Sequence, residues 1–224
     1  MIDFQPLWLT FKLALVTTSV LLLLAIPLAN WLSLSKGKFK AVIEAFISMP
    51  LVLPPSVLGF YFLIAFGPSH GFGKFLEQTF NLRLVFSFPG LVVASIIYSL
   101  PFMVHPIQSG MTALPDTLRE ASYTLGKSKI VTLFNVVIPN IKPALLTGIV
   151  LSFAHTIGEF GVVLMIGGNI PGETKVASIA IYDEVESLNY HSANVYAAIL
   201  FAISFTILLV VYLFNNRYAI TRKL

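Results

Sequence analysis

The stretch EASYTLGKS, Glu120–Ser128, is a charged island in an otherwise apolar sequence. An Ala or Gly, four residues and then Gly-Lys-Ser is the spacing of a phosphate-binding loop, in which a strand leads into glycine-rich backbone whose amides face the phosphates. Here the four central residues are bulky and helix-compatible, and no hydrophobic strand precedes them. The sequence therefore does not predict nucleotide binding by this chain alone.

A second polar group surrounds Glu159, which lies between Gly158 and Gly161 in a long apolar stretch. A carboxyl group is costly in lipid, so it must face the bundle interior, a partner chain or water. We predict a structural or gating residue that hydrogen-bonds a neighbouring helix, with His155 as its possible partner. Ser152 and His155 share one helical face without a third orienting group, so no catalytic residue is predicted.

The composition indicates the class of protein in which these residues lie. Of the 224 residues, 57% are hydrophobic and 11% charged, and the mean hydropathy is +0.87. So few polar groups cannot cover a soluble globule, and a single polytopic membrane domain over residues 1–224 is predicted. The chain has no cysteine, and its four histidines are scattered, so no metal site is expected.

The long apolar runs predict an all-α membrane protein, because a barrel strand would alternate and only helices satisfy their own backbone at this hydrophobicity. About five runs are long enough to span a bilayer, which takes roughly 20 residues. They are Leu13–Ser35, Ala45–Gly73, Leu84–Pro115, Pro143–Gly172 and Ser187–Asn216, the second interrupted by Pro50, Pro54 and Pro55 and the fourth only by Glu159.

The basic residues predict the orientation. With five spans, ten of the 14 lysines and arginines fall on one side, which makes that side cytoplasmic by the positive-inside rule. The N-terminus is then expected outside and the C-terminus inside. These charges mark topology and attraction to a lipid surface rather than nucleic-acid binding, for which a compact basic face would be needed.

The connection between spans three and four, Ser109–Lys142, is the main cytoplasmic segment of this topology. Asp116 is expected to cap a short helix of about nine residues that Gly126 ends. An apolar stripe follows that helix at i, i+3, i+4 and i+7: Leu118, Ala121, Ser122 and Leu125. A helix this short is only marginally stable in water, so its stripe is expected to rest on something.

Further along the same connection, Ser128 is expected to cap a second helix, Lys129–Ile138, that Pro139 ends.

The second span contains two successive prolines, Pro54 and Pro55, which remove backbone donors. This suits a helix break that lines a polar path; a packing kink is the alternative. The spans have no central Lys or Arg. Weak donors are therefore expected to line the path: Ser48, Ser56, Ser152 and Thr156, beside Pro54, Pro55 and Glu159.

Glu120-Ala121-Ser122, then Gly126, then Val136-Val137-Ile138-Pro139 resembles the E-A-A-x3-G-x9-I-x-L-P signature of ABC importer permeases. Ser122 and Val136 depart from it by small changes. The resemblance implies the MetI-like fold of type I importers and a coupling segment that docks into a separate ATP-binding subunit. It assigns that contact to Leu118, Glu120, Ala121, Ser122, Leu125, Gly126 and Pro139.

Three further segments narrow the resemblance to molybdate ABC transporter permeases, over roughly Leu7 to Tyr212. They are PLVLPPSVLGFYFLIAFG (50–67), SFAHTIGEFGVVLMIGGNIPGET (152–174) and IAIYDEVE (179–186). A tungstate or sulfate/thiosulfate permease is the alternative within the family. A secondary transporter is a more distant alternative, which would more often show inverted repeats or several intramembrane ionisable groups.

The resemblance also implies partners and a location. The expected assembly is a homodimer of this chain in the cell membrane, with the path at the two-fold axis. ATP and Mg would be used by the ATP-binding subunit, no cofactor being bound by this chain. An extracytoplasmic oxyanion-binding protein would dock near the loop Gly167–Glu186. Membrane lipid would surround the dimer, and no nucleic acid is expected.

Overall fold

The computed structural model describes residues 3–221, which form helices joined by short loops, without a strand among them. The predicted all-α class is confirmed. The helices are α1 (Gln5–Leu34), α2 (Lys38–Val52), α3 (Pro55–Phe66), α4 (Gly71–Phe80), α5 (Phe88–Thr112), α6 (Asp116–Thr124), α7 (Lys129–Thr132), the π-helical turn η1 (Leu133–Val137), α8 (Ile138–Asn140), α9 (Lys142–Ile157), α10 (Gly161–Gly167), α11 (Ala177–Glu186) and α12 (Tyr190–Thr221).

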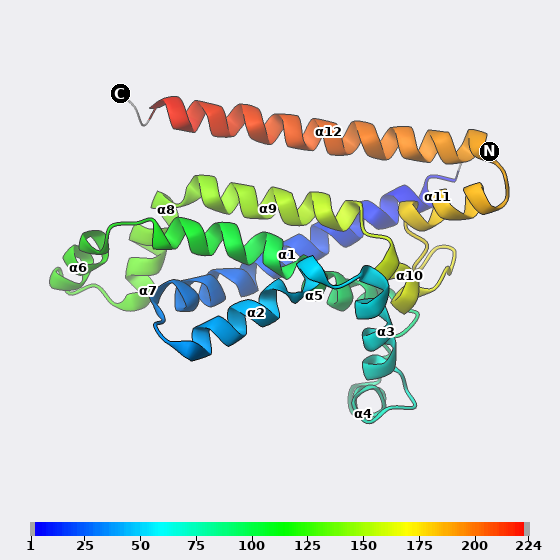
Figure 1. The fold of residues 1–224 in the computed structure, drawn as a ribbon, viewed down its shortest axis with the longest axis horizontal. Helices are drawn as coiled ribbons and strands as arrows, with labels where there is room; N and C mark the ends of the chain where they lie inside the picture. Colours follow the sequence, from blue (N-terminus) through cyan, green and yellow to red (C-terminus); the bar gives the residue numbers. More distant parts are fainter. Residues whose placement is uncertain (1–2, 222–224) are drawn as a thin grey trace.

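The long helices α1, α5, α9 and α12 run along the same axis of the molecule (Figure 1). Helix α1 packs on α5 and α9, and α12 packs on α9 and α11. The segment α6–α8 lies at one end of this bundle, whereas α4, α10 and α11 lie toward the other (Figure 1). The fold therefore has two ends with different elements, joined by long apolar helices.

Two apolar cores lie along this axis. One joins the second half of α1 to the second half of α5 and to η1, for example through Leu32, Ile107 and Val137. The other joins the first half of α1 to α5, α10 and α11, for example through Leu13 and Ile166. Because each core includes both long helices and the short elements at its own end, the short elements are fixed to the bundle.

Three single helices are long and apolar enough to span a membrane: α1, α5 and the part of α12 over Tyr190–Val210. Two bent helix pairs also qualify, which gives up to five spans when each pair is counted as one. The pairs are α2 with α3, bent by 114°, and Lys129–Asn140 with α9, bent by 80°. The described residues thus allow the expected five spans, with the second and the fourth each formed by a bent helix pair.

Pro54 and Pro55 break the second span, as predicted, whereas Pro50 lies inside α2. Leu53 and Pro54 both have extended backbone, with ψ of 137°. A residue before proline avoids the α region, and two successive prolines therefore force two successive extended residues. Pro55 then begins α3 at a position where its missing N–H costs no hydrogen bond.

The prediction of one span over Pro143–Gly172 is wrong. Helix α9 ends at Ile157, and Gly158–Phe160 separates it from α10, which packs on α3 and α5. The physical reason is the polar group of Glu159: its carboxylate is held by Ser95 of α5, and its backbone carbonyl accepts a hydrogen bond from Ser178 of α11 at 2.6 Å. The Ser178 bond satisfies a backbone carbonyl that a continuous helix would pair internally, and the Ser95 bond anchors the side chain at the break.

Helices α3 and α10 pack closely through glycine. A Cβ on Gly59 would lie 2.6 Å from Cβ of Met165 and 3.3 Å from the backbone Cα of Val162. We expect Gly59→Ala to lower the free energy of unfolding by about 1 kcal/mol, because an overpacked contact must shift one helix. Thermal unfolding in detergent measures this. Gly71→Ala, where an added Cβ meets nothing within 4 Å, is the control, and an equal loss in both would contradict the packing argument.

Candidate functional site

Helix α6 buries two polar side chains, whereas its apolar side chains are exposed together with its other polar residues. Arg119 and Ser122 are 6% exposed, whereas Leu118 is 38% and Leu125 77% exposed. The predicted stripe is therefore divided: Ser122 faces inward and bonds Thr132 Oγ1 at 2.8 Å, while Leu118, Ala121 and Leu125 are exposed. An ordinary surface helix has the opposite arrangement.

The ends of α6 differ in part from the prediction. Asp116 is not the N-cap: Pro115 occupies that position, and Asp116 is the first helical residue, without a side-chain capping bond. Its negative charge still lies in the first turn, where it interacts favourably with the helix dipole. Gly126 follows the C-cap residue Leu125 with φ of +74°, as predicted for a glycine that ends a helix.

Ser128 caps the next helix as predicted, since its Oγ accepts a hydrogen bond from the N–H of Val131 at 3.3 Å. Pro139 does not end that helix, which continues through η1 and α8 to Asn140. The reason is its place at the start of α8, directly after the π-helical turn, where a missing N–H is tolerated. The prediction of a stop at Pro139 is wrong.

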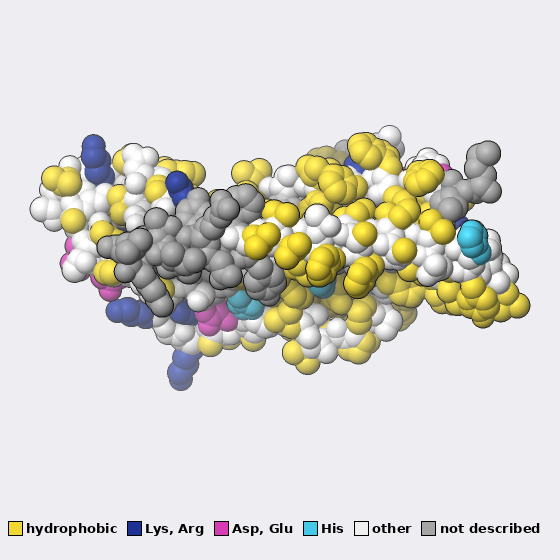
Figure 2. All heavy atoms as spheres, turned by 90° about the horizontal axis from the view of Figure 1, so that it is seen from above, with side chains coloured by type: hydrophobic (Ala, Val, Ile, Leu, Met, Phe, Trp, Pro, Cys, Tyr) yellow, Lys and Arg dark blue, Asp and Glu magenta, His cyan; other side chains and the backbone are white. Residues whose placement is uncertain are grey.

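Large apolar side chains are exposed on both helices of this segment. They form what we call the α6–η1 surface: Leu118, Tyr123, Leu125, Ile130, Val131 and Phe134. Figure 2 shows most of the visible Lys and Arg side chains gathered at one end of the molecule, and hydrophobic side chains over its middle and opposite end. Apolar groups exposed beside such charges mark an interaction surface rather than a lipid-facing one.

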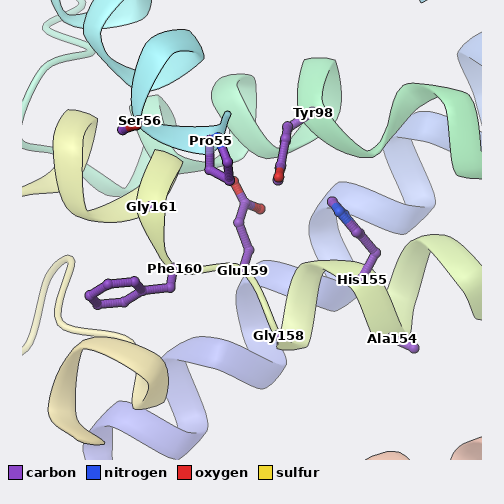
Figure 3. Close-up of a pocket in the computed structure, with 9 residues that line it drawn as sticks. All are labelled: Pro55, Ser56, Tyr98, Ala154, His155, Gly158, Glu159, Phe160 and Gly161. Carbon is purple, nitrogen blue, oxygen red and sulfur yellow. The ribbon is translucent and has the colours of Figure 1, made fainter. Parts of the chain in front are cut away.

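A second candidate site is an open pocket of about 520 Å³ where both helix breaks meet. It is lined by Pro55, Ser56, Tyr98, Ala154, His155, Gly158, Glu159, Phe160 and Gly161. In Figure 3 the carboxylate of Glu159 points toward Pro55 and Tyr98, and the Phe160 ring points away from them. Three of the predicted path residues, Pro55, Ser56 and Glu159, are thus brought together.

Glu159 is 4% exposed, and its Oε2 accepts a hydrogen bond from Ser95 Oγ of α5 at 2.7 Å. The predicted bond to a neighbouring helix is confirmed, but His155 is not its partner. His155 Nδ1 instead contacts Ser99 Oγ at 2.9 Å, and its ring stacks on Phe102 with 4.0 Å between centroids. The other carboxylate oxygen of Glu159 has no hydrogen-bond partner in the described structure.

The remaining predicted path residues lie outside this pocket. Thr156 and Ser152 are buried on α9, where Thr156 Oγ1 contacts Ser99 Oγ at 3.1 Å and Ser152 Oγ has no partner in the part of the chain that the structure describes. Ser48 lies on α2, and its Oγ contacts His105 Nε2 of α5 at 3.1 Å. Pro54 lies at the α2–α3 break without lining the pocket.

The sequence prediction missed Tyr98 in the pocket, Ser95 behind it as the partner of Glu159, and Arg119 on α6. Ser95 and Ser99 are spaced i, i+4 in the third apolar run, so they lie on one helical face. That spacing was the available signal for a polar face toward Glu159 and His155. No sequence signal indicated that Arg119 is buried, because a charged residue on a short polar helix is ordinarily exposed.

Comparison with known proteins defines the class to which this fold and these sites belong. Residues 21–221 match the family of binding-protein-dependent transport system inner membrane components, and the chain belongs to that family. It is therefore an inner-membrane, multi-pass permease component of an ABC transporter. Members of this class are not themselves catalytic, the ATPase being a separate subunit.

The chain is similar to the molybdenum transport system permease ModB of Azotobacter vinelandii, with 44% identity over 211 residues that cover 94% of this chain and 93% of that protein. It is 33% identical to a molybdenum permease homologue, YvgM of Bacillus subtilis, over 92% and 90% of the two chains. It is also 36% identical to a probable sulfate permease, cysT of Prototheca wickerhamii, over 81% and 70%.

Two solved structures share the fold. The MetNI methionine ABC transporter in an inward-facing form gives a TM-score of 0.71 at 14% identity, covering 95% of this chain and 94% of the compared one. A bacterial ABC transporter that imports alginate gives 0.73 at 15% identity, covering 96% and 80%. The predicted importer permease fold is confirmed by these likenesses.

Proposed function

We propose that this chain is the membrane permease of an ATP-driven molybdate importer, in which the α6–η1 surface receives the ATP-binding subunit. The observation that carries the proposal is the pattern of burial on α6 and its C-cap, where Arg119 is buried and the apolar Leu118 and Leu125 are exposed. A short helix that exposes its apolar face at a membrane protein's charged end is suited to burying that face in a partner. The motif residues Glu120, Ala121 and Gly126 lie on the same segment.

The proposed orientation places the α6–α8 end in the cytoplasm. The loop before α2, with Lys36, and the start of α2 at Lys38 lie at the same end as α6 and the last turns of α12 (Figure 1). Helices α4 and α11 and the beginning of α1 lie toward the opposite end (Figure 1). Collection of the basic segments at one end supports the assignment by the positive-inside rule.

The pocket at the two helix breaks is proposed as part of the oxyanion path. It offers hydroxyl groups of Ser56 and Tyr98 but no Lys or Arg among its lining residues. Neutral donors bind a dianion weakly, which favours fast passage and leaves selectivity to an external binding protein. Ser48, Ser152 and Thr156 remain proposals for the path in other states of the transporter.

The proposed assembly contains a second copy of this chain, an ATP-binding subunit that uses ATP and Mg, and an extracytoplasmic oxyanion-binding protein. A solved structure with the same fold supports this assembly: a bacterial alginate ABC transporter in complex with its alginate-bound periplasmic protein. Molybdate is preferred because two relatives matching more than nine-tenths of this chain are named for molybdenum. Sulfate is the second candidate, supported by the sulfate permease relatives.

Oxyanion-stimulated ATP hydrolysis tests the proposal. The chain is reconstituted in liposomes with its ATP-binding subunit and binding protein, and molybdate, tungstate and sulfate are compared. We expect molybdate to stimulate hydrolysis and to accumulate inside, with the chain alone hydrolysing no ATP. Stimulation by sulfate alone would make sulfate, rather than molybdate, the substrate. ATP hydrolysis by the purified chain would contradict the permease assignment.

A further inference from the structure

Arg119 is a buried arginine on the coupling helix α6. Its side chain is on the inner face of a helix whose neighbouring residues Leu118 and Glu120 are exposed. A guanidinium group is expensive to remove from water unless hydrogen bonds or charges replace the lost hydration. Its burial therefore calls for specific partners, and these define what the residue can do.

The partners lie in the last turn of α1. Arg119 Nη1 donates to Asn30 Oδ1 at 3.4 Å, and Nη2 donates to Ser33 Oγ at 3.5 Å. The carboxyl end of a helix carries unpaired carbonyl groups and the negative end of the helix dipole, so it favours a cation. Within residues 3–221, no carboxylate forms an ion pair with Arg119. The guanidinium is thus held by neutral groups and by the end of α1.

Helix α6 has a second attachment one turn further along. Ser122 Oγ contacts Thr132 Oγ1 of α7 at 2.8 Å, and both side chains are buried. In the described part of the chain, the hydrogen bonds from α6 to α1 both come from Arg119. Two attachments to two different elements fix the tilt of α6, whereas one attachment would leave it free to pivot.

Helix α1 continues from this contact into the bundle. Its last turns pack in the core through Ala29 and Leu32, together with Met111 of α5. Near its other end, Thr10 Oγ1 accepts a hydrogen bond from the N–H of Ala177 at 2.8 Å, where α11 begins. A displacement applied to Arg119 thus acts on one continuous helix that contacts elements at both ends of the molecule.

We propose that Arg119 is a positioning residue that clamps α6 to the end of α1, so that movement of the ATP-binding subunit reaches α1 as well as α7 and η1. The proposal rests on the proposed function of the α6–η1 surface. Arg119 contacts neither the anion nor ATP. Its effect is on how much transport each ATP hydrolysis produces, not on whether the ATP-binding subunit is bound.

The transport test uses the reconstituted complex and measures molybdate moved per ATP hydrolysed. We expect Arg119→Met, which keeps the volume but loses the hydrogen bonds, to lower this ratio about fivefold, the low end of typical coupling free energies. Affinity for the ATP-binding subunit should change less than about twofold. Arg119→Lys should recover at least half of the wild-type ratio of molybdate transported to ATP hydrolysed. Adding Asn30→Ala to Arg119→Met should lower this ratio little further, because both substitutions remove the same contact. Arg83→Met, exposed near the opposite end, is the control.

A second measurement does not depend on transport. The chain has no cysteine, so Lys36→Cys and Thr124→Cys allow clean spin labelling of the α1 end and α6. We expect the distance distribution between the labels to broaden in Arg119→Met and not in Arg83→Met. An unchanged distribution, an unchanged transport ratio or loss of subunit binding in Arg119→Met would each overturn the clamp. Failure of the wild-type complex to respond to any oxyanion would instead contradict the proposed function.

Discussion

Replacing Leu125 by aspartate is expected to remove most of the affinity of this chain for its ATP-binding subunit. Leu125 is 77% exposed, directly before the glycine that ends α6. If the α6–η1 surface is buried in the partner, the substitution loses the burial of a leucine and places a charge in the contact. Losing about 2 kcal/mol corresponds to roughly a 30-fold weaker complex. Binding of the purified subunit to the chain in detergent measures this.

Leu188→Asp is the matched control for this prediction. Leu188 is 72% exposed, and it follows α11 near the other end of the molecule. Its φ is +60°, a conformation that aspartate tolerates better than leucine does, so the control should fold at least as well. Equal affinity of the two variants for the ATP-binding subunit would rule out the α6–η1 surface as the contact.

The apolar runs and the prolines were sufficient to predict most of the fold. Continuous hydrophobic runs gave the helices, and Pro54 with Pro55 gave the break between α2 and α3 because proline acts locally on the residue before it. The break between α9 and α10 was not predictable in the same way. It depends on contacts of Glu159 with residues 64 positions earlier and 19 positions later in the chain. Such long-range contacts leave no periodic pattern around Glu159 itself.

The segment from α6 to α8 shows the same division. Its length, its final glycine and the Ser128 cap were read from local residue types, and the structure has them. Which face of α6 is inside could not be derived from those residues. An apolar stripe ordinarily packs inward, and only the contacts of Arg119 with α1 and of Ser122 with α7 turn it outward.

The pocket was predicted in part, because an intramembrane carboxyl group is itself informative. The cost of Glu159 in lipid required a partner on another element, and Ser95 on α5 fulfils this. The choice of His155 followed from sequence proximity. A residue one turn away on the same helix could reach Glu159 only if the helix continued, and it ends at Ile157.

Removing the Ser95 hydroxyl is expected to have the largest effect on this pocket. In Ser95→Ala the Glu159 carboxylate loses the one side-chain hydrogen bond that the described structure gives it. Leaving a buried polar group unsatisfied costs about 1–3 kcal/mol, and more when the group is charged. We expect the free energy of unfolding to fall by about 3 kcal/mol, seen as a lower thermal midpoint in detergent. Ser19→Ala, which removes an exposed hydroxyl bonded within its own helix, is the control.

A double variant separates stability from transport. When both partners of a buried hydrogen bond are replaced by apolar groups, the cost can be nearly neutral. Ser95→Ala combined with Glu159→Leu should therefore regain most of the stability lost in Ser95→Ala. Transport of molybdate by the reconstituted complex should nevertheless be lost in this double variant, because the polar wall that Glu159 gives the pocket is absent. Recovery of both stability and transport would limit Glu159 to a packing role and move the oxyanion path away from the helix breaks.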